Sequence, residues 1–300
     1  MTATTAPSAH RALPTGQRSR ERSPGATLFL VLLWASLLVA FATLVTLLVS
    51  TVVEAGDRLG PTLLTEYPSS RPEEAGARPA VLGSLWVIGT TAVLSVPLGI
   101  AAAVHLEEFA DRHSRVNRLL ELNIQNLSAI PSIIYGMLAI GTLSLIGVQN
   151  KNIVIGGALA LALLILPVII ISTREALRAV PREQRQASLA LGATELQTTW
   201  RVTLPAAVPG ISTGTILALS RALGEAAPLL LLGALVFISF DPNGLLSGFT
   251  TMPIQIFGWT NSPQAGFREL AAAASVLLVV ILLAMNALAI IIRNRSQRRW

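Results

Sequence analysis

The sequence predicts an all-α integral membrane protein with six transmembrane helices. Of its 300 residues, 52% are hydrophobic and only 13% are charged, whereas an average soluble protein carries about 25% charged residues. Several uncharged runs are also long enough to cross a membrane, since about 20 helical residues span the hydrocarbon layer of a bilayer. These runs are apolar throughout rather than alternating, which favours helices over the strands of a barrel.

The chain begins with a tail and one isolated span. Residues 1–27 are rich in Ser, Thr, Pro, Ala and Arg, and this composition predicts a disordered cytoplasmic tail. Residues 28–53 form the first transmembrane helix; a cleaved signal peptide is disfavoured because its apolar region is only about 7–15 residues long. Residues 54–79, rich in Pro, Gly and acidic residues, form an extracytoplasmic loop.

Five further spans form a core, residues 80–292, which is followed by a basic cytoplasmic tail, residues 293–300. Within the core a long connection, residues 174–209, separates the fourth span from the fifth. The runs that define the five spans are Ala80–Val104, Leu122–Asn150, Asn152–Thr173, about Ala206–Phe240 and Leu270–Ile292. The fourth of these runs contains Arg221 and Glu225.

The positive charges predict the orientation of the spans. Sixteen of the 22 Lys and Arg residues fall in the two terminal tails and in the connections after the second and fourth spans, and five fall on the opposite side. Cytoplasmic segments of membrane proteins carry such an excess of positive charge. We therefore expect a multi-pass protein of the cell membrane with both termini, and the connection 174–209, in the cytoplasm.

No motif for catalysis is visible in the sequence. Cysteine is absent and the three histidines are isolated, so we expect no metal site. Lys151 is the only lysine, and no glycine-rich phosphate loop precedes it, so the chain is not an ATPase by itself. We expect a non-enzymatic chain that binds no cofactor, and no nucleic acid, because its basic residues lie between apolar runs.

Two short helices are expected in the cytoplasmic connection. Pro181 marks the start of the first, and Gly192 ends it because glycine tolerates a left-handed cap. Thr194 and Gln197 have capping-box spacing and start the second helix, after which Val202–Pro205 turns the chain back toward the membrane. These two short helices and Gly192 between them, here called the elbow, would fit a groove on a partner protein. From the residues alone, an amphipathic linker lying on the membrane is the favoured alternative.

The same connection resembles the EAA loop of ABC importer permeases, whose pattern is E-A-A-x3-G-x9-I-x-L-P. The glycine, leucine and proline match at both spacings, while Gln186, Ser188 and Val202 replace the Glu, the second Ala and the Ile. The resemblance implies that this loop is a coupling helix, which docks into a groove on a nucleotide-binding subunit. The residues it assigns to ATPase coupling are Gln186, Ala187, Ser188, Gly192, Leu204 and Pro205.

Three other segments narrow the resemblance. Ala129–Gly136 and Ser220–Leu229 are similar to the third-span and fifth-span signatures of phosphate-type permeases, and Met252–Phe257 to an outer-loop segment of the PstA half. Residues 28–292 thus resemble a PstA-type permease subunit of a phosphate ABC importer. This implies the type I ABC importer permease fold, with one N-terminal helix and a five-helix core.

The resemblance also implies partners and a transport mechanism. The partners would be a second, related permease subunit, two copies of an ATP-binding subunit that hold ATP and Mg, and an extracytoplasmic phosphate-binding protein. Transport would proceed by alternating access, driven by the ATPase subunits through the coupling loop.

Arg221 and Glu225 are the candidate substrate-pathway residues. An arginine at the centre of a span costs about 2.5–3.5 kcal/mol and persists by pairing or by facing a water-filled path. The planar guanidinium group of Arg221 suits an oxyanion, to which it can donate two parallel hydrogen bonds. The four-residue spacing of Arg221 and Glu225 would place both side chains on one face of a helix. The alternative is a structural ion pair. Arg174 is a further candidate anion contact, although a topology anchor is the favoured interpretation there.

Other functions are also compatible with these residues. Another oxyanion, molybdate or sulfate, could replace phosphate, although the fifth-span signature argues against it. An ion-coupled secondary transporter would show paired broken helices with midplane ligands in two repeats, and no second-half counterpart of Arg221 is visible. An intramembrane enzyme would need a nucleophile–base pair, which the sequence does not offer.

Overall fold

The structure, a computed structural model, describes residues 24–111, 114–234 and 237–296. Most of the predicted tail 1–27 and the last four residues of the predicted tail 293–300 therefore lie outside the described residues. Every element of regular secondary structure in the described ranges is helical. The chain divides into two units, Met1–Val49 and Ser50–Trp300, which are described separately.

The first unit contains most of α1, Pro24–Ala55, and this helix includes the predicted span 28–53. It contains no proline after Pro24, at the first position, where a proline is tolerated, and no glycine after Gly25. The Thr43 and Thr46 hydroxyls donate to the carbonyls of Val39 and Ala42 one turn back. These two hydroxyls are therefore satisfied within the helix, as an apolar surrounding requires.

The second unit contains all the remaining elements. In chain order they are η1 Gly56–Arg58, α2 Thr62–Thr65, α3 Arg78–Val104, η2 His105–Phe109, α4 Arg115–Ser128, α5 Ser132–Leu145, α6 Val154–Arg178, α7 Arg182–Ala190, α8 Glu195–Thr198, η3 Thr199–Thr203, α9 Leu204–Leu223, α10 Ala227–Leu231, α11 Met252–Thr260 and α12 Ala265–Ser296.

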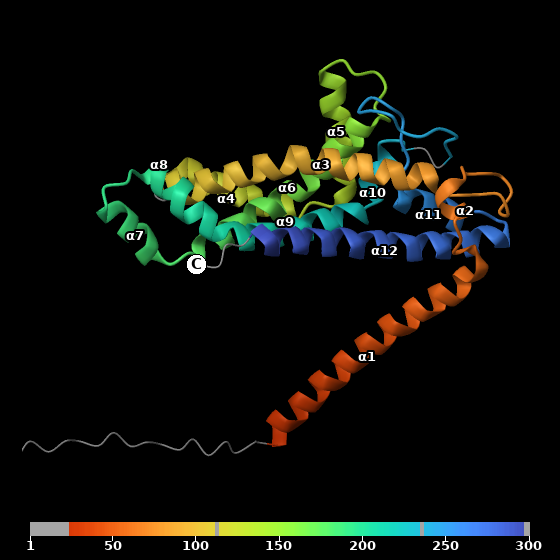
Figure 1. The fold of residues 1–300 in the computed structure, drawn as a ribbon, viewed down its shortest axis with the longest axis horizontal. Helices are drawn as coiled ribbons and strands as arrows, with labels where there is room; N and C mark the ends of the chain where they lie inside the picture. The colour runs from red at the N-terminus through yellow and green to blue at the C-terminus, as the bar shows by residue number, and fades with distance from the viewer. Residues whose placement is uncertain (1–23, 112–113, 235–236, 297–300) are drawn as a thin grey trace, which may run out of the picture. The chain divides into compact units, whose positions relative to one another are not determined.

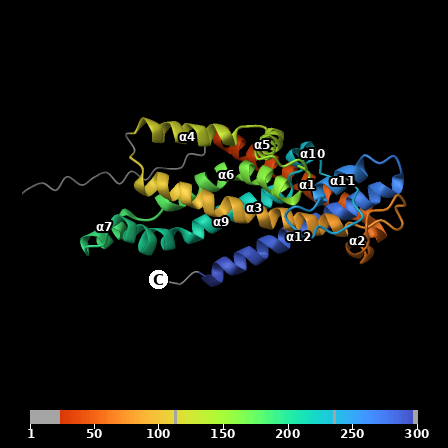
Figure 2. The same ribbon diagram turned by 90° about the horizontal axis from the view of Figure 1, so that it is seen from above.

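Helix α6 lies at the centre of this unit, between α3 and α9 (Figures 1 and 2). Small residues allow the close approach of these helices. A Cβ atom at Gly99 of α3 would lie 2.6 Å from the Cγ2 atom of Ile169, and one at Gly214 of α9 would lie 2.3 Å from the Oγ atom of Ser172. The small residues of α3 and α9 therefore serve packing within the chain.

The prediction of one continuous third span, Leu122–Asn150, is wrong. The run is divided between α4 and α5, whose axes are bent by 114°. Pro131 follows the end of α4 and lacks the amide hydrogen that a continuing helix would need, and the Tyr135 hydroxyl donates to the Leu127 carbonyl at 2.5 Å across the bend. The described chain has five helices that could cross a membrane, or up to six if the bent pair counts as one.

Two π-helical turns extend the long helices. The turn η2 continues α3 without a break, and η3 joins α8 to α9. The expectation that Val202–Pro205 turns the chain back is therefore wrong, because residues 195–223 form one continuous helical segment.

The two ends of the second unit carry different elements. One end, called the α7 end, holds α7, α8, η2 and the last residues of α12; the other, called the α11 end, holds α2 and α11 (Figures 1 and 2). At the α11 end the predicted loop 54–79 is ordered, because Leu63, Ala75 and Ala77 are buried in a cluster with side chains of α11 and α12.

Candidate functional site

The elbow predicted in the connection 174–209 is present at the α7 end. Helix α7 follows Pro181, and Gly192 has a φ of +88°, the left-handed conformation expected for it. The Thr194 amide donates to the Gln197 side chain at 3.0 Å, and the Gln197 amide donates to the Thr194 hydroxyl at 3.3 Å. The capping box at the start of α8 is therefore confirmed.

The surface of the elbow combines polar and apolar side chains. Gln186 and Ala187 are exposed, while the Ser188 hydroxyl lies 2.9 Å from that of Thr198 and ties α7 to α8. Beside them Leu191 is 90% exposed, and three more large apolar side chains are exposed, those of Leu189, Leu196 and Trp200. These four were missed in the sequence; their signal was the presence of large apolar residues around Gly192 in short, otherwise polar helices.

Two further predicted coupling residues lie at the start of α9. Leu204 begins α9 and packs against a buried cluster that includes Leu177, Val180 and Ala207. Pro205 follows it and is exposed. Leu204 thus anchors the segment that carries the elbow.

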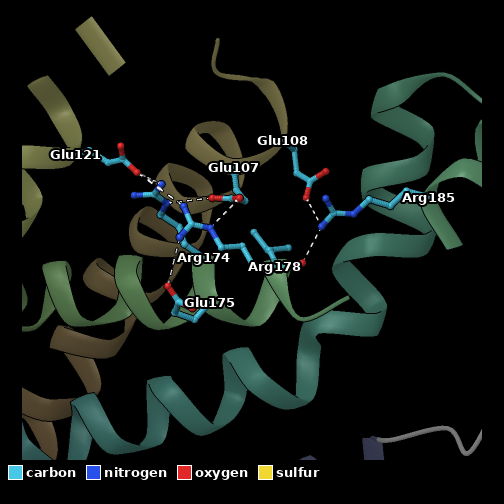
Figure 3. A network of polar contacts seen from close by, with 8 residues as sticks. Glu107, Glu108, Glu121, Arg174, Glu175, Arg178 and Arg185 are labelled. Atoms are coloured by element: carbon cyan, nitrogen blue, oxygen red, sulfur yellow. Dashed lines mark hydrogen bonds and ion pairs between the residues drawn. The ribbon is translucent and has the colours of Figure 1, made fainter. Parts of the chain in front are cut away.

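Beside the elbow lies a group of charged side chains, here called the ionic cluster: Glu107 and Glu108 from η2, Glu121 from α4, Arg174 and Arg178 from α6, and Arg185 from α7 (Figure 3). Glu107 lies between two arginines, with its carboxylate oxygens 3.3 Å from Arg174 Nε and 2.9 Å from Arg178 Nε. Its side chain is only 2% exposed, so these ion pairs compensate a buried charge.

The cluster also determines the place of Arg174, a predicted anion contact. Its side chain is 11% exposed and is paired with both Glu107 and Glu121. An adjoining cavity of about 250 Å³ is lined by charged residues of both signs, including Asp111 and Arg118. An anion at Arg174 would therefore have to displace at least one carboxylate.

The other candidates, Arg221 and Glu225, do not share a helix face. Helix α9 ends at Leu223 and Gly224 follows it, so the expected one-turn relation is wrong. No ion pair joins the two side chains within the described residues. Arg221 is exposed and Glu225 is half-buried.

The break after α9 brings two sequence signatures together. A Cβ atom at Gly136 of α5 would lie 2.4 Å from the Pro228 carbonyl oxygen at the start of α10. The segments 129–136 and 220–229 therefore meet in the fold, and Arg221 lies in the last turn of α9, before this contact. This contact requires glycine at position 136.

The third signature, Met252–Phe257, lies in α11 and is a packing element. Met252, Ile254 and Gln255 are buried, and the Met252 amide donates to the Ser84 hydroxyl of α3 at 2.9 Å. A Cβ atom at Gly83 would lie 2.0 Å from the Thr250 carbonyl oxygen. In the described part of the chain no group of three His, Cys, Asp or Glu side chains could hold a metal ion.

Comparisons with known proteins agree with this arrangement. Residues 95–300 match the family model described as binding-protein-dependent transport system inner membrane component. The chain is 35% identical over 232 residues to the phosphate transport system permease protein PstA 1 of Mycobacterium tuberculosis, covering 76% of this chain and 74% of that one. It is 33% identical over 264 residues to PstA of Yersinia pestis, covering 88% of each chain.

Solved structures give the same fold. A bacterial ABC transporter involved in the import of the acidic polysaccharide alginate contains a chain that matches with a TM-score of 0.62 at 16% identity, covering 89% of this chain and 96% of that one. A chain of the MetNI methionine ABC transporter matches with a TM-score of 0.55 at 19% identity, over 77% and 100% of the two chains. The chain belongs to the binding-protein-dependent inner membrane components, and it is an inner-membrane permease of an ABC transporter.

Proposed function

We propose that the chain is the PstA-type permease of a phosphate importer. The observation that carries this proposal is the similarity, over about three quarters or more of the chain, to curated proteins named as phosphate transport permeases. The meeting of the segments 129–136 and 220–229 at Gly136 and Pro228 supports it, since both resemble signatures of such permeases.

The proposed complex contains four kinds of subunit. A second, related permease would complete the translocation path, two ATP-binding subunits would supply ATP and Mg, and an extracytoplasmic binding protein would deliver phosphate. Both termini and the α7 end would face the cytoplasm, as the distribution of arginine predicts. The α7 end and the α11 end lie at opposite ends of α3, as this orientation requires (Figure 1).

The elbow is the proposed ATPase-coupling element. Its exposed apolar side chains, Leu191, Leu196 and Trp200, form a surface of the kind that marks a protein interface. The surrounding residues Gln186 and Ala187 are exposed and available to the same partner. The resemblance of this segment to the EAA loop favours docking into a partner over an amphipathic linker lying on the membrane.

Arg221 is the proposed phosphate contact of the pathway. Its guanidinium is exposed at the junction of α9 and α10 and can donate two parallel hydrogen bonds to an oxyanion. The negative charge of Glu225 would repel an anion bound at Arg221 and so limit the time for which it stays bound. Arg174 ranks lower, because Glu107 and Glu121 already neutralise it.

Uptake by the assembled transporter in vesicles tests the proposal. Arg221→Gln should lower phosphate uptake at least about tenfold, the value of a lost charge-assisted hydrogen bond, and Arg221→Lys should recover only part of it. Binding of phosphate by the separate binding protein should not change. Native uptake by Arg221→Gln would exclude Arg221 from the pathway.

Stronger inhibition of uptake by molybdate or sulfate than by unlabelled phosphate would favour the oxyanion alternative, and uptake without any ATPase subunit would favour a secondary transporter.

Labelling with an impermeant thiol reagent tests the orientation. The native chain lacks cysteine, and Ser70 and Thr194 are both exposed. Ser70→Cys should react from outside the cell, and Thr194→Cys should react only after the membrane is opened. Reversed labelling would contradict the orientation and place the elbow on the wrong side for ATP.

A further inference from the structure

Helix α7 is joined to the membrane helices by polar contacts rather than by burial. None of its nine residues is fully buried, whereas 14 of the 25 residues of α6 are. A short helix without buried side chains is held by whatever specific contacts its neighbours provide. The contacts of Arg185 are therefore important for the position of α7.

Arg185 joins α7 to two other elements. Its Nη2 atom lies 2.9 Å from a carboxylate oxygen of Glu108 in η2 and donates to the Leu177 carbonyl of α6 at 2.7 Å (Figure 3). The Glu108 side chain is only 9% exposed and that of Arg185 is 22% exposed. Water screens this pair less than an ion pair on an open surface.

Glu108 belongs to the turn that also carries Glu107. Glu107 is held by Arg174 and Arg178 of α6, and Glu121 of α4 contacts the same two arginines. The turn η2 continues directly from α3, which packs along α6. A displacement of α7 that is transmitted through Arg185 would therefore act on the end of α3.

We propose that Glu108 and Arg185 are positioning residues that transmit the movement of the elbow to α3. The inference rests on the proposed role of the elbow in coupling, and adds the contact by which its movement enters the transmembrane helices. Glu107, fixed by Arg174 and Arg178, holds the other side of η2, so the turn moves together with α6 and does not yield separately.

The test uses the full transporter, reconstituted in vesicles with its ATPase subunits and binding protein. The quantity measured is the phosphate imported per ATP hydrolysed, together with co-purification of the ATPase subunits. Glu108→Gln and Arg185→Gln should each lower the ratio about tenfold, within the 5–150-fold range of energetic coupling between sites, and leave co-purification unchanged. A purely structural role would instead lower abundance, import and hydrolysis together.

A matched control is available on the same helix. Arg182 is exposed in the first turn of α7, and the described residues offer it no ion pair. Arg182→Gln should keep the native ratio. The double variant Glu108→Gln with Arg185→Gln should be no worse than the poorer single variant, because each single substitution already breaks the ion pair between the two side chains.

Other outcomes separate the inference from the proposed function. A native ratio in either single variant, an equal fall in Arg182→Gln, or multiplied effects in the double variant would overturn the role of the pair. Should a glutamine variant fail to accumulate, Arg185→Lys keeps the charge and should stay within about twofold of the native ratio, since Arg185 contacts Glu108 through a single nitrogen and an ammonium can make one such contact; a tenfold fall would contradict the inference. Failure of the native chain to bind ATPase subunits would instead contradict the proposed function.

Discussion

The α7 end and the α11 end of the second unit are held together by different interactions. At the α11 end, Met252, Ile254 and Gln255 are buried, and the backbone at Thr250 approaches Gly83 so closely that no side chain fits between them. At the α7 end, helix α7 has no buried residue, and the ion pair of Arg185 with Glu108 joins it to η2. The α11 end is held by close packing, whereas α7 is held by a small number of directed contacts.

This difference shows which end is free to move. Close-packed interiors resist displacement, because any shift creates voids or overlaps, whereas ion pairs at a partly exposed site tolerate shifts and depend on few atoms. The exposed Leu191 and Trp200 belong to the surface at which docking of a partner is proposed. We therefore expect substitutions at the α11 end to change stability, and those at the α7 end to change transport.

The largest effect is expected at Gly83. Gly83→Val would place a side chain against the Thr250 carbonyl oxygen and should destabilise the protein by about 3 kcal/mol or more, the upper range for overpacking. Thermal unfolding in detergent and membrane abundance measure it. Gly89→Val, on the same helix with no atom within 4 Å of its Cβ position, is the matched control and should be close to native. Equal stability of the two variants would show that the α11 end is not rigidly packed.

Gly192 should give a smaller loss of stability and a larger loss of transport. A left-handed conformation costs a residue with a Cβ atom about 1–2 kcal/mol, and Gly192→Val would carry this cost in the elbow. Gly147→Val is the control, because Gly147 also has a positive φ, of +78°, but lies between α5 and α6. Both variants should lose similar stability, while only Gly192→Val should lose most of its phosphate uptake. Equal uptake would remove the elbow from the coupling path.

The smallest effect is expected at Ser84. Ser84→Ala leaves the buried Met252 amide without its hydrogen-bond acceptor and should cost about 1–2 kcal/mol. Thr90→Ala is the control, since the Thr90 hydroxyl donates only within its own helix, to the Trp86 carbonyl. Uptake per molecule should stay native in both. A change in uptake without a change in unfolding temperature would assign a transport role to the α11 end.

Local features could be predicted from the sequence. The apolar runs predicted the spans except for the bend between α4 and α5 and the end of α9, which lies at Leu223 rather than near Phe240. Gly192 predicted the left-handed residue, and Thr194 with Gln197 predicted the capping box, because each depends on residues within a few positions. The role of glycine at position 136 was not predicted, since it depends on the backbone of Pro228 in another segment.

The ionic cluster could not be predicted for the same reason. Arg174 lies 67 positions from Glu107 and 53 from Glu121, and Arg178 lies 71 positions from Glu107. Charged residues near the ends of spans also arise from topology, so they carry no signal of pairing by themselves. For Arg221 and Glu225 the spacing was misleading, because Gly224 ends the helix between them.

The π-helical turn η3 has a consequence for the rotational phase of the helices that it joins. A π turn holds one residue more than an α turn, and each residue of an α-helix advances the side chains by about 100° around the axis. Removal of one residue between Thr199 and Thr203 would therefore restore an α turn, and because a π turn and an α turn each complete about one revolution, α8 and the elbow before it would keep nearly the same direction relative to α9. A one-residue deletion within α9, outside the π turn, would instead rotate the elbow by about 100° and change the direction in which Leu191 and Leu196 face.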